Sequence, residues 1–138
     1  MNNIGKQAAL YSRIASKGHG VCDYIKHQQK TLRAFAIEQG YEDYKEYSDI
    51  GYSGNDFARP SMKDLWDDIT AGKINVVVVR DMSRISRNLV QLEQWVKETE
   101  GYGVKLITLD GSHRIRFTTD DFLKLMKARK KLNIDCSQ

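Results

Sequence analysis

The sequence predicts an α/β fold with a mostly parallel central sheet and helices on both faces. Two observations lead to this class. Residues Ile74–Val79 form an apolar, mostly β-branched run without alternation, which is typical of a strand buried on both faces of a parallel sheet. Segments of this kind alternate along the chain with segments whose apolar residues recur at helical spacing. A length of 138 residues, 41% hydrophobic content and one proline suit a single compact domain spanning residues 1–138.

The chain begins with a strand and a helix. The apolar stretch Gln7–Arg13 predicts a short strand, and a polar, glycine-containing loop follows over residues 16–20. A helix then runs from about Asp23, which is expected to serve as its N-cap, to Gln39. Gly40 ends it, because glycine readily takes the conformation that follows a helix.

A second strand and helix follow. Residues 42–48 alternate tyrosines with charges, so we expect an exposed strand there. The glycine-containing stretch 49–60 predicts a loop. Ser61 is expected to cap a helix that ends near Gly72.

After the strand at 74–79, the chain predicts two more helices and one strand. A helix is expected over Arg87–Glu100 and a strand over Val104–Leu109. A final short helix, capped by Thr118 or Thr119, ends in the basic run Lys127–Lys131.

Positively charged residues follow two of the predicted strands. In open parallel sheets, sites lie at the carboxyl ends of the strands, and Arg13 and Ala15 stand at the end of the first. The residues just after the strand at 74–79 are Arg80, Asp81, Ser83, Arg84 and Arg87. Any one of these arginines could be an ordinary surface ion-pair partner. Together they form a cationic cluster with little acid, which is costly unless an anion fills it, and guanidinium groups match phosphate oxygens well.

Four tracts of the chain form motifs. They are Tyr11-Ser12-Arg13-Ile14-Ala15, Ile25-Lys26-His27-Gln28 with Leu32, Asp49-Ile50-Gly51-Tyr52-Ser53-Gly54 with Arg59-Pro60, and Arg80-Asp81-Met82-Ser83-Arg84-Ile85-Ser86-Arg87-Asn88. In this order they resemble the motifs of the serine site-specific recombinases, which comprise resolvases, invertases and the larger integrases and transposases. The stretch Asp81–Arg84 and the long loop over 16–23 are similar to the large integrase and transposase branch. The resemblance covers about residues 7–111.

The resemblance implies DNA as the partner and a reaction that needs neither a metal nor a cofactor. In this family a serine hydroxyl attacks a DNA phosphodiester, which gives a 5′-phosphoserine intermediate and a free 3′-hydroxyl. The implied phosphate ligands are Arg13, Arg59, Arg84 and Arg87, with Gln28 assisting. Arg80 and Ser83 are implied to lie along the DNA. Taken alone, Gln28 favours a structural role, because a glutamine on an exposed helix is commonplace.

The nucleophile position of the first motif is occupied by Ala15. A methyl group cannot attack phosphorus, so we expect this form to be inactive. Ser16 would substitute only if the register shifted at the strand end, because successive strand side chains point to opposite faces, and Ser12 points away for the same reason. Either Ala15 replaces a serine by design, or the chain is a non-catalytic relative that binds DNA or a recombinase partner.

The carboxyl end departs from the family pattern. Family members continue into a long dimerisation helix and a DNA-binding domain, so the resemblance implies a catalytic domain truncated before both. The full-length protein is then expected to form a homodimer or tetramer. Lys127, Arg129 and Lys130 could contact the DNA backbone, or could complement the dipole of the last helix.

Other classes are disfavoured by the sequence. No stretch reaches the roughly 18 apolar residues of a membrane span and no signal peptide opens the chain, so we expect a cytoplasmic protein. A formal net charge of +4 and a pI near 9.0 suit a polyanionic partner. Cys22 and Cys136 form no metal or disulfide motif, and the three histidines are scattered. A receiver-like signalling domain would need acidic residues where this chain has arginines.

Overall fold

The computed structural model describes residues 7–16, 18, 20–53 and 58–112. Its elements in chain order are β1 (Gln7–Ile14), α1 (Val21–Glu38), β2 (Tyr44–Ile50), α2 (Pro60–Thr70), β3 (Ile74–Val79), the 3₁₀ turn η1 (Met82–Arg84), α3 (Leu89–Gly101) and β4 (Lys105–Thr108). The strands form one four-stranded sheet in the order β2-β1-β3-β4, and every neighbouring pair is parallel. The predicted α/β class with a parallel sheet is confirmed.

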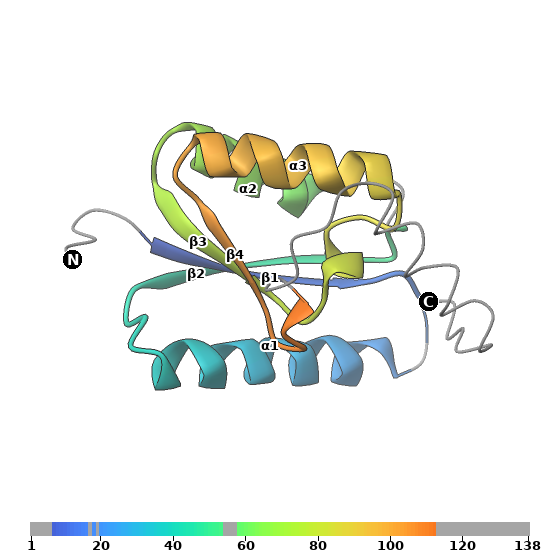
Figure 1. The fold of residues 1–138 in the computed structure, drawn as a ribbon. Helices are drawn as coiled ribbons and strands as arrows, with labels where there is room; N and C mark the ends of the chain where they lie inside the picture. Colours follow the sequence, from blue (N-terminus) through green and yellow to red (C-terminus); the bar gives the residue numbers. More distant parts are fainter. Residues whose placement is uncertain (1–6, 17, 19, 54–57, 113–138) are drawn as a thin grey trace.

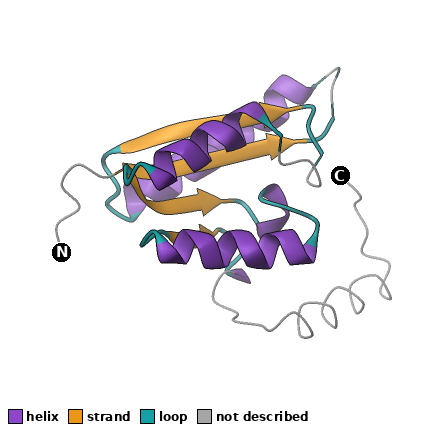
Figure 2. Ribbon diagram, turned by 90° about the horizontal axis from the view of Figure 1, so that it is seen from above, coloured by secondary structure: helices purple, strands orange, loops and turns teal. Residues whose placement is uncertain are grey.

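Helices cover both faces of this sheet. α1 lies on one face, and α2 and α3 lie side by side on the other (Figures 1 and 2). The side chains of β1 alternate between the two cores. Leu10 packs with Leu32 of α1, whereas Tyr11 belongs to the core under α2 and α3. Because β1 is an interior strand with both faces covered, its residues from 8 to 13 are all buried.

β3 has the bounds that the sequence predicts. Its apolar run packs against helices on both faces, and Val77, Val78 and Val79 have no exposed surface. β4 covers the middle of the stretch predicted for it. A strand buried on both faces therefore leaves a clear signal in sequence.

The strand expected at 42–48 is present, but it is shifted by two residues and is only partly exposed. β2 runs over Tyr44–Ile50 and pairs with β1 in parallel, with Tyr47 opposite Tyr11. Tyr47 and Asp49 are 4% and 2% exposed because this edge strand has α2 on one face, and the Tyr47 hydroxyl donates to Asp68 of that helix. Burial of strand residues by a helix that comes later in the chain cannot be predicted from the strand's own residues.

The helix starts also differ from those predicted. α1 begins at Val21 rather than Asp23, after Gly20 in the left-handed conformation (φ 83°), which costs glycine little. Asp23 lies in the first turn, where its charge complements the helix dipole. α3 begins at Leu89, capped by Asn88, whose Oδ1 accepts from the Gln91 amide at 3.0 Å. The helix expected after Thr118 or Thr119 lies outside the described residues.

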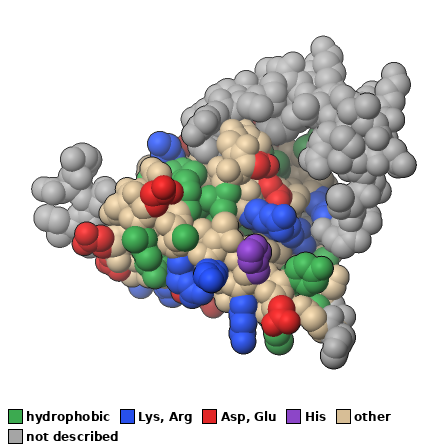
Figure 3. Space-filling model, turned by 90° about the horizontal axis from the view of Figure 1, so that it is seen from below, with side chains coloured by type: hydrophobic (Ala, Val, Ile, Leu, Met, Phe, Trp, Pro, Cys, Tyr) green, Lys and Arg blue, Asp and Glu red, His purple; other side chains and the backbone are tan. Residues whose placement is uncertain are grey.

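The outer face of α1 is basic. Figure 3 views the molecule from this side and shows Lys and Arg side chains beside a histidine. α1 contributes exposed Lys26, His27 and Lys30, while Arg33 forms an ion pair with Glu46 of β2 at 3.4 Å. Positive charge is therefore not confined to the strand ends. Of the helices in the described ranges, none is long and apolar enough to cross a membrane.

Candidate functional site: an arginine cluster at the carboxyl edge of the sheet

The carboxyl ends of β1 and β3 meet, as the sequence predicts. The two strands are paired and parallel, so Arg13 near the end of β1 lies beside the turn that follows β3. Asp81 shapes this turn, because its Oδ1 accepts from the Ser83 amide at 3.0 Å and from the Ser83 hydroxyl. Three arginines from distant parts of the sequence converge here: Arg13, Arg59 and Arg84.

Arg13 is fully buried, and its guanidinium donates to main-chain carbonyl groups. Nε donates to Arg84 O at 3.2 Å, Nη1 to Tyr52 O at 2.8 Å and Nη2 to Ser83 O at 2.8 Å. The side chain thus ties the end of β1 to the loop after β2 and to the turn after β3.

Arg59 is also fully buried and occupies the N-cap position of α2. Its Nη1 donates to Arg84 O at 2.9 Å and its Nη2 to Ile85 O. The guanidinium carbon lies 5.7 Å from the centre of the Tyr11 ring, a cation–π arrangement. Arg59 therefore reaches the same turn as Arg13, but from the start of α2 rather than from the end of β1.

Arg84 is the member of this trio with solvent access. Its side chain is 13% exposed, Nη1 donates to Arg13 O at 3.1 Å, and Nε lies 3.6 Å from Asp81 Oδ2. Arg80 and Arg87 are exposed, and Ser83 is partly buried. Access to the cluster is thus through Arg84 and Arg87.

The positive charges of the cluster repel one another. Burial, together with the neighbouring charges of Arg59 and Arg84, lowers the pKa of Arg13 to about 10. Burial also lowers the pKa of Arg84, while the Asp81 carboxylate opposes that shift. Main-chain carbonyls accept hydrogen bonds from all three guanidiniums, but they are neutral and leave the positive charge in place. An anion would relieve this repulsion.

Gln28 lies beside the cluster, where its amide holds the main chain of β1. It is 5% exposed, its Oε1 accepts from the Arg13 amide at 3.1 Å, and its Nε2 donates to Arg13 O at 3.3 Å. α1 therefore supplies a side chain that continues the hydrogen bonding of the strand at its end.

Ala15, at the position that the resemblance implies for the nucleophile, directly follows β1. Ala15 is partly buried and Ser16 is exposed. Ser12 is 1% exposed, and its hydroxyl has no hydrogen-bond partner among the described residues. It alternates with Tyr11 and Arg13, which face the α2–α3 side, so the expectation that Ser12 points away from the site agrees with the strand geometry.

Sequence reasoning missed Asp49 and Tyr11. The Asp49 carboxylate accepts from the Tyr11 hydroxyl at 2.7 Å and from the main-chain amides of Ser61 and Met62 at 2.9 and 3.0 Å. It thereby caps α2 and locks the start of that helix, next to Arg59, onto β1. Both residues open motifs recognised in the sequence, but the hydrogen bond that joins them spans 38 residues.

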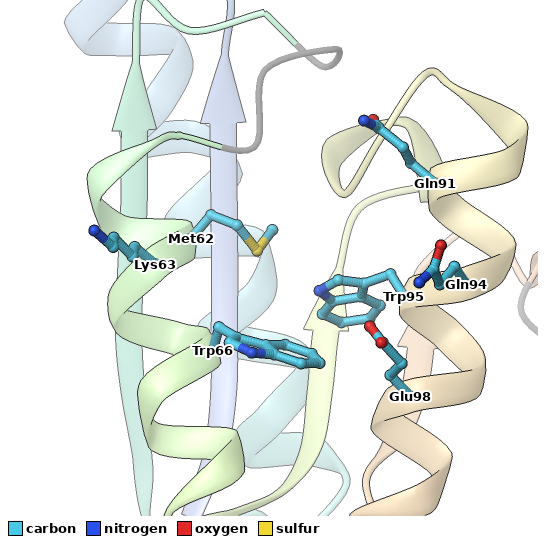
Figure 4. A pocket seen from close by; sticks show the side chains of 7 residues that line it. All are labelled: Met62, Lys63, Trp66, Gln91, Gln94, Trp95 and Glu98. Atoms are coloured by element: carbon cyan, nitrogen blue, oxygen red, sulfur yellow. The ribbon is translucent and has the colours of Figure 1, made fainter.

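Lys127, Arg129 and Lys130 are outside the described residues. Within the described ranges no group of three or more His, Cys, Asp or Glu side chains could hold a metal ion. A groove of about 300 Å³ lies between α2 and α3 rather than at the cluster, with the two indole rings of Trp66 and Trp95 in its wall (Figure 4).

Comparisons with known proteins fit this architecture. The family model described as "Resolvase, N terminal domain" matches residues 8–133. The chain is 36% identical over 62 residues to "Uncharacterized immunity region protein 3" of Bacillus phage phi105, covering 44% of this chain and 76% of the phage protein. It is 27% identical over 105 residues to the "Putative DNA recombinase" of Bacillus subtilis (strain 168), covering 76% of this chain but 21% of that protein.

The fold is also similar to that of a solved structure. That structure is of a resolvase family site-specific recombinase from Streptococcus pneumoniae, with a TM-score of 0.69 and 26% identity over 94% of this chain and 91% of the other. Since one family model spans residues 8–133 and a recombinase superposes on nearly the whole fold, this chain belongs to the resolvase family and has the fold of a serine recombinase catalytic domain.

Proposed function

We propose that this chain is a recombinase catalytic domain that binds a DNA phosphodiester at its arginine cluster. The observation that carries the proposal is the meeting of three distant arginines beside the residue that follows β1. Preorganised positive groups can neutralise charge that develops on the nonbridging phosphate oxygens, and this requires no metal.

The proposed chemistry requires a hydroxyl at position 15. A serine Oγ would attack phosphorus, forming the Oγ–P bond while the P–O3′ bond breaks, and the leaving 3′ oxygen would take up a proton. The bond energy is kept in the phosphoserine, so the reverse attack can rejoin the strand. Ala15 offers no lone pair for the first step. The chain as it stands is therefore proposed to bind the phosphodiester without cutting it.

The test compares the native chain with Ala15→Ser. DNA duplexes carrying a bridging 3′ phosphorothiolate trap the intermediate, because the released thiolate rejoins poorly. We expect a covalent protein–DNA adduct, resistant to denaturation, with Ala15→Ser and none with the native chain. The same substitution combined with Arg84→Gln serves as the control and should lose the adduct. If Ala15→Ser binds DNA but forms no adduct, the proposal that the site lacks only its serine is overturned.

A second candidate function is that of a non-catalytic relative that binds DNA or a recombinase partner. Ala15 itself favours it, and so does the similarity to a phage protein whose name places it in an immunity region. This candidate predicts DNA binding by the native chain, with no gain of cleavage when serine is introduced.

We also propose that the chain belongs to the branch of large integrases and transposases. The Asp81–Arg84 stretch supports this placement, and so does the Bacillus subtilis relative, of which this chain spans about a fifth.

A further inference from the structure

The two fully buried arginines share one target, the turn Ser83–Ile85. Its three consecutive carbonyls all accept from them: Ser83 O from Arg13, Arg84 O from both arginines, and Ile85 O from Arg59. We propose that Arg13 and Arg59 are positioning residues that form a clamp on this turn and act on the phosphate through Arg84. In this assignment, direct contact with the anion falls to Arg84 and Arg87.

The clamp fixes Arg84 at two points. Its carbonyl is held by Arg13 Nε at 3.2 Å and by Arg59 Nη1 at 2.9 Å, and its own Nη1 donates back to Arg13 O at 3.1 Å. Main chain and side chain are therefore anchored to the same strand end. Asp81 adds an ion pair, with its Oδ2 lying 3.6 Å from Arg84 Nε. A side chain held in this way loses little freedom when it binds a ligand.

Burial separates the two roles. Arg13 and Arg59 have no exposed surface, whereas Arg84 is partly accessible and Arg87 is exposed. Arg13 commits three of its five N–H donors to main-chain carbonyls and has no exposed surface, so a phosphate oxygen could reach the other two only if the surrounding chain moved. The buried guanidinium charges still act through space, because carbonyls are neutral acceptors. Arg13 and Arg59 thus hold Arg84 in position and contribute positive electrostatic potential, while Arg84 and Arg87 contact the phosphate directly.

The first test uses the native chain and nuclear magnetic resonance of ¹⁵N-labelled arginine side chains, with inorganic phosphate as the probe. Before phosphate is added, the Arg13 and Arg59 guanidinium protons should exchange slowly with water. During the titration the Arg84 and Arg87 signals should move, and those of Arg13 and Arg59 should stay nearly fixed. Movement of Arg13 or Arg59 as large as that of Arg84 would overturn the assignment.

The second test is Arg59→Lys, which keeps the charge but cannot donate to two carbonyls from a planar fork. We expect the backbone amides of residues 83–86 to shift, and the phosphate affinity read from Arg84 to fall by about tenfold. The matched control is Arg33→Lys, at a partly exposed arginine paired with Glu46 on the α1 side. An unchanged turn and unchanged affinity in Arg59→Lys would contradict the clamp.

Only the last step of this inference rests on the proposed phosphate site. If Arg84 and Arg87 ignore phosphate in the native chain, the proposed function fails. The clamp is still judged by slow proton exchange at Arg13 and Arg59 and by the shift of the turn in Arg59→Lys. Rapid exchange at both guanidiniums in the native chain would refute the clamp, whatever phosphate does.

Discussion

Asp49→Ala should destabilise the domain strongly, because one buried carboxylate joins two elements. Asp49 is 2% exposed, accepts from the Tyr11 hydroxyl at 2.7 Å, and caps α2 through the amides of Ser61 and Met62. Removing a helix cap costs about 1–2 kcal/mol. Leaving the buried Tyr11 hydroxyl without its acceptor adds about 1–3 kcal/mol.

The expected loss is therefore about 2–5 kcal/mol in the free energy of unfolding. It is measured by urea denaturation followed by circular dichroism. For a chain of this size the same loss lowers the melting temperature by roughly 6–15 °C, at about 3 °C per kcal/mol. Asp67→Ala, at an exposed position of α2, is the matched control and should change stability by less than about 0.5 kcal/mol.

A double-mutant cycle separates the two contributions of Asp49. Tyr11→Phe removes the hydroxyl, so in that background Asp49→Ala no longer leaves a buried hydroxyl without its acceptor. We expect a coupling energy of about 1 kcal/mol between the two substitutions. A coupling near zero, or a loss for Asp49→Ala below about 1 kcal/mol, would refute the role of Asp49 as the link between β1 and α2.

Two further predictions follow from the same geometry. Burial and hydrogen bonds to Asp49 and Asp68 raise the pKa values of Tyr11 and Tyr47 far above 10. Above pH 10 the folded state keeps phenol protons that the unfolded state releases, so these two groups lower stability as pH rises. The lowered pKa of Arg13 acts in the opposite sense, so absorbance at 295 nm, which reads tyrosinate alone, is the appropriate assay. It should show two of the seven tyrosines ionising only with unfolding, and their ionisation in the folded protein would contradict the burial. Inorganic phosphate should raise the melting temperature of the native chain, by the equivalent of about 2.7 kcal/mol at 100 times its Kd. Arg84→Gln should remove this shift and Arg33→Gln should keep it, and a shift that survives in Arg84→Gln would place the anion elsewhere.

The fold class, and the edge of the sheet that carries the candidate site, can both be predicted from the amino-acid sequence. β3 is a β-branched run buried on both faces, and its bounds could be predicted because every residue of such a strand shares the same environment. The rule that parallel strands present their sites at their carboxyl ends then predicts from sequence that Arg13 and Arg84 lie close together.

Only the tertiary structure decided which groups these arginines bond to. Arg13 reaches Tyr52 O and Ser83 O, 39 and 70 residues away, and main-chain carbonyls leave no mark in a sequence. The burial of Tyr47 in β2 depends on α2, and the role of Asp49 depends on where Tyr11 and the start of α2 come to lie. A sequence specifies patterns along the chain, whereas hydrogen-bond partners are chosen by packing between segments far apart in it.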